Sequence, residues 1–84
     1  MSGIETRVAV VIVNYNAGDA LTRCVESVLS QGRGMRVMIV DNASTDNSAR
    51  SVNDLFGRLD NVSVMFNEEN LGFSRAVNQA ANRL

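Results

Sequence analysis

The chain has no histidine, lysine, proline or tryptophan, and Cys24 is the only cysteine among its 84 residues. Without histidine, an imidazole can be neither a general base nor a metal ligand here. A single cysteine excludes an internal disulfide and fits a reducing compartment, so we expect a cytoplasmic protein, at most associated with the inner face of a membrane. Because Cys24 falls on the apolar face of a predicted helix, we expect a buried, unreactive thiol.

Long apolar runs and blocks of one charge are also missing. Eight basic and nine acidic residues give a net charge of −1, which argues against a nucleic-acid partner or a polybasic membrane anchor. The longest apolar run, residues 8–13, is far shorter than the roughly 20 residues that span a bilayer. Glu5 and Arg7 precede this run, and it has no cleavage-like end, so no signal peptide is predicted. The length supports one small domain or part of a larger one.

Three apolar runs alternate with three helical patterns. The runs 8–13, 37–40 and 61–66 predict strands, and residues 1–6 read as a loose lead-in. Apolar spacings of three and four predict helices that begin at Gly18 or Asp19, near Asp46 and at Gly72. The first helix is expected to end at residues 31–34, where a glycine can adopt the left-handed conformation. The predicted buried helical positions are Leu21, Cys24, Val25, Val28, Leu29; Ala49, Val52, Leu55, Phe56, Leu59; and Phe73, Ala76, Val77, Ala80, Ala81, Leu84.

The order strand–helix, three times repeated, predicts a parallel sheet with right-handed crossovers, half of a doubly wound α/β domain. In such a half the first strand lies beside the second and the third lies beyond them. We therefore expect residues 1–84 to form a single partial domain, a three-layer α/β/α Rossmann-like half. The strand 8–13 would then expose an unpaired edge, through which we expect the chain to form a homodimer or to aggregate.

Polar residues follow each predicted strand, at the carboxyl edge where open α/β sheets bind ligands. An Asp beside an Asn, as in Asp41-Asn42, offers the acceptors and donors that suit a pyrimidine base or ribose hydroxyls. Tyr15 can stack on a base, and the helix start at Gly72, with Arg75 in its first turn, can hold a phosphate. The candidate nucleotide-binding residues are Asn14, Tyr15, Asn16, Asp41, Asn42, Asn70, Gly72, Arg75 and Asn78.

Each candidate also has a plainer interpretation. Asparagines in loops commonly bond their own backbone, Tyr15 can simply cover the end of the sheet, and Arg75 can be a solvated charge. Asp46, like the two hydroxyl residues before it, is best explained as a helix cap. Asp41 differs, because we expect that the fold does not need a carboxylate at that position, whereas a ligand would use one. Asp41 is therefore the candidate that most favours a binding site.

The sequence lacks two phosphate-binding motifs and fits one signalling fold poorly. The loop at residues 14–19 lacks the glycines of a dinucleotide-binding fingerprint, and a Walker loop needs the lysine that the chain lacks. A phospho-receiver domain needs acids after the first strand and an aspartate after the third. These strands end at Asn14 and Asn67 instead.

Three motifs in order resemble the opening of family 2 glycosyltransferases: residues 10–16 (VVIVNYN), 40–46 (VDNASTD) and 70–73 (NLGF) with Asn78. The resemblance covers nearly the whole chain. Asp-Asn in the second motif together with Asn-Leu-Gly-Phe in the third is most similar to the bacterial rhamnosyltransferase-like branch. Ala80 departs from the family, in which many members have glycine.

The resemblance implies the N-terminal part of a GT-A fold and an inverting transfer of a sugar from a dTDP- or UDP-sugar to a glycan or lipid-linked acceptor. It implies that Asn14, Tyr15 and Asn16 line the nucleotide site, that Asp41 holds the base, and that the stretch 70–72 closes the pocket. The family's Mg²⁺- or Mn²⁺-binding Asp-x-Asp motif and its catalytic base cannot be placed in this chain, so we name no catalytic or metal residue and expect no transfer by this chain alone. The alternative is a non-catalytic α/β interaction module or another nucleotide-binding Rossmann-like domain.

Overall fold

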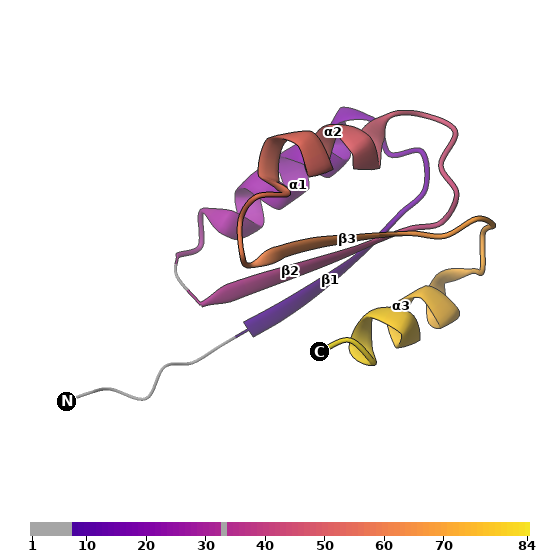
Figure 1. Ribbon diagram of the computed structural model, residues 1–84. Helices are drawn as coiled ribbons and strands as arrows, with labels where there is room; N and C mark the ends of the chain where they lie inside the picture. Colours follow the sequence, from indigo (N-terminus) through magenta and orange to yellow (C-terminus); the bar gives the residue numbers. More distant parts are fainter. Residues whose placement is uncertain (1–7, 33) are drawn as a thin grey trace.

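Six elements follow one another in the order that the sequence predicts (Figure 1). The computed structural model describes residues 8–32 and 34–84, so the expected lead-in at residues 1–6 and position 33 of the predicted turn lie outside the described residues. The elements are β1 Val8–Asn14, α1 Asp19–Leu29, β2 Met35–Asp41, α2 Ser48–Phe56, β3 Val62–Phe66 and α3 Phe73–Ala81. The strands β1 and β2 extend beyond their predicted ends to include the polar residues Asn14 and Asp41.

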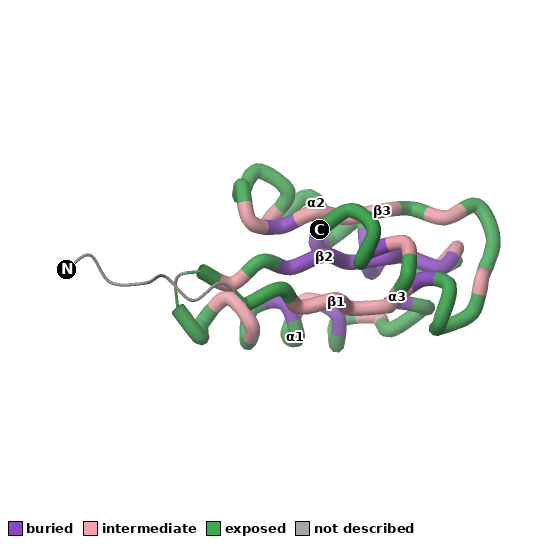
Figure 2. The backbone as a smooth tube through the Cα atoms, turned by 90° about the horizontal axis from the view of Figure 1, so that it is seen from below, coloured by how far each residue is buried: buried purple, intermediate pink, exposed green. Residues whose placement is uncertain are grey.

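The three strands form one parallel sheet in the order β1-β2-β3, which confirms the predicted topology. The helices α1 and α2 cover one face of the sheet and α3 covers the other (Figure 1). Central strand β2 is buried from Val37 to Asp41, and it is the longest buried stretch of the backbone in Figure 2. In the register of the sheet, Asn14, Asp41 and Phe66 stand side by side at the carboxyl ends of the strands.

Alternate side chains of β2 belong to two separate hydrophobic cores, as expected for a strand that is covered on both faces. Val37 and Ile39 pack under α1 and α2, and Met38 and Val40 pack under α3. The first core is the larger one, and its buried members from the two helices are Leu21, Val25, Ala49 and Val52. Under α3 only Ala76 and Ala80 are buried from the helix, so this core is thin.

Several helical positions predicted to be buried are exposed. The prediction of a buried thiol is wrong, because Cys24 is exposed. The prediction is also wrong for Leu55, Leu59, Phe73, Ala81 and Leu84. These helices have only eleven, nine and nine residues, and each presents two or three fully buried positions to the sheet. In so small a domain, apolar residues on the flanks of a helix find no neighbour to cover them.

The ends of the helices differ slightly from expectation. Helix α2 begins at Ser48 rather than at Asp46, and α1 ends at Leu29, with the left-handed Gly32 three residues later (φ 119°). No helix within residues 8–32 and 34–84 has the length and apolar character needed to cross a membrane.

Candidate nucleotide-binding edge of the sheet

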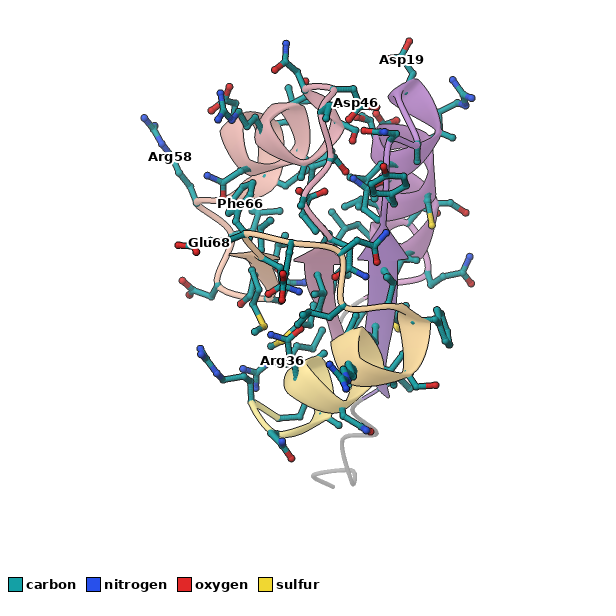
Figure 3. All side chains as sticks on the ribbon, turned by 90° about the vertical axis from the view of Figure 1, so that its right-hand side faces the viewer. Asp19, Arg36, Asp46, Arg58, Phe66 and Glu68 are labelled. Carbon is teal, nitrogen blue, oxygen red and sulfur yellow. The ribbon has the colours of Figure 1, made fainter. Side chains whose placement is uncertain are left out.

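Three loops meet at the carboxyl edge of the sheet, and Figure 3 looks onto this edge. They follow β1, β2 and β3, and backbone hydrogen bonds continue the sheet into them: the amide of Asn42 donates to the carbonyl of Asn14 at 2.9 Å, and that of Asn67 to Asp41 at 2.9 Å. Parallel strands place these ends at one edge by geometry alone. The side chains of the loops then form two hydrogen-bond networks.

The first network centres on Asp41, of which only 5% is exposed. Its Oδ1 accepts hydrogen bonds from Asn14 Nδ2 at 2.8 Å and from Ser44 Oγ at 2.6 Å, and its Oδ2 accepts one from the Ser44 amide at 3.1 Å. Asn14 Nδ2 also donates to Ser48 Oγ at 2.8 Å. The expectation that the fold does not need Asp41 is therefore wrong, because its carboxylate joins the loops after β1 and β2.

Asp46 lies at the surface between the first turns of α1 and α2 (Figure 3). Its Oδ1 accepts hydrogen bonds from the hydroxyl of Ser48 and, at 3.1 Å, from the amide of Ser48, and its Oδ2 accepts one from the Gly18 amide at 3.0 Å. The side chain and backbone of Ser48, and then the Gly18 amide, lower the pKa of Asp46 below its usual range. Asp46 thus accepts the first backbone amide of α2, as predicted, but it is not the cap residue: that position is Asn47, whose side chain makes no capping bond. Asp46 also accepts the amide of Gly18, the residue at the cap position of α1.

The second network centres on Asn42, of which only 2% is exposed. Its Nδ2 donates to the Gly72 carbonyl at 3.2 Å, and its Oδ1 accepts from Asn67 Nδ2 at 2.9 Å. The amide groups of Asn67 and Gln79 form a reciprocal pair at 2.8 and 3.0 Å. This network fixes the loop after β3, and with it the start of α3, against the end of β2.

The plainer interpretation of the asparagines, in which each bonds its own loop, is wrong for Asn14, Asn16 and Asn42. Their side chains bond residues 25 to 34 positions away in the sequence. Between Asn42 and Ser44, Ala43 adopts a left-handed conformation (φ 61°), which is costly for a residue with a Cβ. Strain of this kind tends to occur where loop geometry serves a function.

The other candidates lie on the outside of this edge. Tyr15, Asn16, Asn70, Arg75 and Asn78 are all exposed. Asn70 Oδ1 accepts a hydrogen bond from the Gly72 amide at 2.8 Å, and Gly72 has φ 81°, a conformation that favours glycine. None of the described residues accepts a hydrogen bond from the next three amides, those of residues 73–75. The start of α3 therefore keeps N–H groups available at the carboxyl edge.

Four members of the networks are not among the candidates predicted from the sequence: Ser44, Ser48, Asn67 and Gln79. Two of them, Ser48 and Gln79, lie in helices. Both read as ordinary helical residues, and nothing in their local sequence signals a partner. Their role follows only from the approach of the first turn of α2 to Asn14, and of the middle of α3 to Asn67.

The described residues contain no group of three or more Asp, Glu or Cys side chains that could hold a metal ion. The acids present therefore do not fit the Mg²⁺ or Mn²⁺ that the resemblance implies, and no chemical step can be derived through a metal in this chain. One hollow of about 590 Å³ lies at the amino ends of β1 and β2 beside Arg36 and Asp60, and an open hollow of about 610 Å³ lies at the carboxyl edge, beside Phe66 and Leu71. The polar edge described above is an open rim rather than a closed pocket.

The parallel sheet, its helices on both faces and its loops at the carboxyl edge define a Rossmann-like half domain. The model of one protein family, Glycosyl transferase family 2, matches residues 9–84. The chain belongs to this family, which confirms the resemblance to family 2 glycosyltransferases but does not extend to the rhamnosyltransferase-like branch.

Three relatives of the chain are, by name, a glycosyltransferase and two proteins of polysaccharide synthesis. It is 38% identical over 78 residues to the succinoglycan biosynthesis protein ExoU of Rhizobium meliloti, covering 89% of this chain and 22% of the relative. It is 38% identical over 66 residues to glycosyltransferase GlyG of Streptococcus pneumoniae, covering 77% and 22%. The chondroitin synthase of Pasteurella multocida is 35% identical over 74 residues, covering 87% and 8%. The chain thus spans about a fifth of the first two relatives, at 22% of each.

Proposed function

We propose that this chain forms the nucleotide-binding half-site of an inverting glycosyltransferase that uses a dTDP- or UDP-sugar. The observation that carries the proposal is the rim at the carboxyl edge, where two hydrogen-bond networks fix all three loops relative to one another. Membership of the family supports the glycosyltransferase activity. The activity, the nucleotide, its position and the donor sugar are all parts of the proposal.

Asp41 and Tyr15 are the proposed contacts to the base. A carboxylate can accept about four hydrogen bonds, and Asp41 accepts three within the chain, two on Oδ1 and one on Oδ2. Its Oδ2 can therefore accept one more, from an N–H of a pyrimidine. Tyr15 is 54% exposed and offers its ring for stacking. Asn14 and Asn42 are buried beneath this rim, where they hold Asp41 and the loop after β3 in place.

The start of α3 is the proposed site of the diphosphate. Its first amides are available, the helix dipole favours an anion there, and Asn70 fixes the turn at Gly72. Arg75 in the first turn adds a positive charge, and Asn78, one turn further, can donate to the ribose or phosphate. The role of these residues is to bind and orient the donor so that its anomeric carbon faces the acceptor.

We further propose that the acceptor is a growing polysaccharide or a lipid-linked glycan, and that transfer takes place in the cytoplasm at the inner face of the membrane. The names of the relatives, in which succinoglycan and chondroitin appear, support a polysaccharide. The donor sugar is proposed to be a hexose, with rhamnose favoured by the motifs Asp41-Asn42 and Asn70-Leu71-Gly72-Phe73. The metal ligands and the catalytic base are proposed to lie in sequence outside these 84 residues.

An amide-resolved NMR titration with UDP, dTDP and, as a control, NAD tests the proposal. We expect UDP or dTDP to shift the amides of residues 14–16, 41–42 and 70–75, with NAD producing smaller changes. Shifts confined to the opposite edge, near Arg36 and Asp60, would contradict the proposed position. A folded spectrum that none of the three compounds changes would contradict nucleotide binding by this half-site.

One edge of β1 has no neighbouring strand among the described residues, and Val8 at its start is 45% exposed. Unpaired strand edges readily accept a second strand. We therefore propose that the chain forms homodimers through β1. Sedimentation velocity over a range of concentrations is expected to show a dimer, and a single monomeric species at the highest concentration would contradict it.

A further inference from the structure

Tyr15 lies between two residues that the structure anchors firmly. Asn14 is 1% exposed and bonded into the first network. Asn16 is exposed, yet its side-chain Oδ1 accepts hydrogen bonds from the amides of Thr45 at 2.7 Å and Asp46 at 3.2 Å. The loop after β1 is therefore held on both sides of its only aromatic residue.

In two further contacts, backbone amides of the loop after β1 donate to side chains of the loop after β2. The amide of Asn16 donates to Ser44 Oγ at 2.9 Å, and the amide of Gly18 donates to Asp46 Oδ2 at 3.0 Å. We call Asn16, Ser44 and Asp46 the loop clasp, since each uses its side chain to bond the backbone of the other loop. Asn16 also adopts a left-handed conformation (φ 51°), which asparagine tolerates better than most residues.

The orientation of the Asn16 amide follows from its partners. Two backbone N–H groups face it and both need an acceptor, so the oxygen must point toward Thr45 and Asp46. No described residue accepts a hydrogen bond from its Nδ2. The side chain is thus committed to the protein through its oxygen, while a contact to nucleotide would have to use Nδ2.

We infer that Asn16 is a positioning residue of the nucleotide site, which acts by holding Tyr15 ready for the base rather than by touching the nucleotide. This inference rests on the proposed function. A loop that is already ordered loses little conformational freedom when the ligand binds, so the clasp raises affinity without any direct contact. In the positioning role the essential atom of Asn16 is Oδ1, whereas in a direct contact to the nucleotide it would be Nδ2.

Two substitutions separate these roles. Asn16→Asp keeps oxygen acceptors for both amides and removes Nδ2, whereas Asn16→Gly tolerates the left-handed backbone and removes the whole side chain. We expect UDP or dTDP to bind Asn16→Asp within about threefold of the unchanged chain, and Asn16→Gly about tenfold or more weakly. Asn47→Asp is the control for added charge, because Asn47 is exposed beside Asp46 and makes no capping bond.

The inference is overturned if Asn16→Asp, corrected for the loss in Asn47→Asp, binds as weakly as Asn16→Gly. That result would make Nδ2 a direct ligand contact. It is also overturned if Asn16→Gly binds as well as the unchanged chain. Circular dichroism and denaturant unfolding establish that each variant is folded before it is titrated.

Measurements without nucleotide distinguish failure of this inference from failure of the proposed function. In the unchanged chain, the amides of Thr45 and Asp46 are expected to exchange slowly with solvent and Tyr15 to be ordered in ¹⁵N relaxation. In Asn16→Gly, both amides are expected to exchange faster and Tyr15 to become mobile. If exchange and relaxation change as expected but the chain binds neither UDP nor dTDP, the proposed function is contradicted, and the positioning role with it. Nucleotide binding with unchanged exchange in Asn16→Gly contradicts the clasp alone.

Discussion

Replacement of Asp41 by alanine is expected to destabilise the chain by about 3 kcal/mol. The carboxylate is 5% exposed and accepts hydrogen bonds from Asn14 and from both the amide and hydroxyl of Ser44. Hydrogen bonds to charged groups contribute about 1.5–3 kcal/mol each. Removal of the carboxylate leaves the amide and hydroxyl of Ser44 without their acceptor, whereas Asn14 Nδ2 keeps its bond to Ser48. A chain of this size has about 4–12 kcal/mol of stability in all. The substitution is therefore expected to bring the fold close to its limit.

Denaturant unfolding gives this loss directly, and thermal unfolding should show a decrease of about 12 °C or more in Tm. Asp54→Ala is the matched control, since Asp54 is exposed on α2, and we expect it to change stability by less than about 0.5 kcal/mol. Equal effects of the two substitutions would show that the network around Asp41 contributes nothing. A double-mutant cycle with Asn14→Ala then isolates the bond between Asn14 and Asp41, because coupled neighbours depart from additivity.

The sequence predicts the position of Asp41 but not its contribution to the stability of the fold. Its place at the end of a buried strand follows from the apolar run before it, and the carboxyl edge follows from the alternation of strands and helices. That the carboxylate turns inward, to Asn14 and Ser44, depends on the register of β1 against β2 and on the path of a strained loop at Ala43. Neither has a local sequence signal.

The order and pairing of the strands can be predicted from the sequence, whereas the burial of several helical side chains cannot. Strand order and parallel pairing follow from the connections, which permit few alternatives. Burial of Cys24, Leu55 and Phe73 was predicted from helical periodicity, and all three are exposed. Periodicity identifies the side of a helix that is apolar, but the width of the buried stripe depends on which neighbours pack against it. In this small domain few elements pack against each helix, so the buried stripe of each helix is narrow.

Replacement of Tyr15 by alanine is expected to weaken UDP or dTDP binding strongly while leaving stability nearly unchanged. Stacking of a base on an aromatic ring contributes about 1–3 kcal/mol, which corresponds to an increase of about 5- to 150-fold in Kd. Since the side chain is 54% exposed in the free protein, its removal opens no cavity in either core. Calorimetric or NMR titration of the variant against the unchanged chain measures the effect, and denaturant unfolding checks that the fold is intact.

A second exposed aromatic residue provides a control for the loss of apolar surface. Phe66 ends β3 at the same edge, is 51% exposed, and lies on the far side of that edge from the first turn of α1 (Figure 3). We expect Phe66→Ala to leave Kd within about twofold and Tyr15→Phe, which retains a ring for stacking, to bind nearly as well as the unchanged chain. Equal losses for Tyr15→Ala and Phe66→Ala would place the base elsewhere on the rim. A loss in Tyr15→Phe as large as in Tyr15→Ala would show that the hydroxyl, rather than the ring, makes the contact, because the two variants differ in the ring that stacking requires.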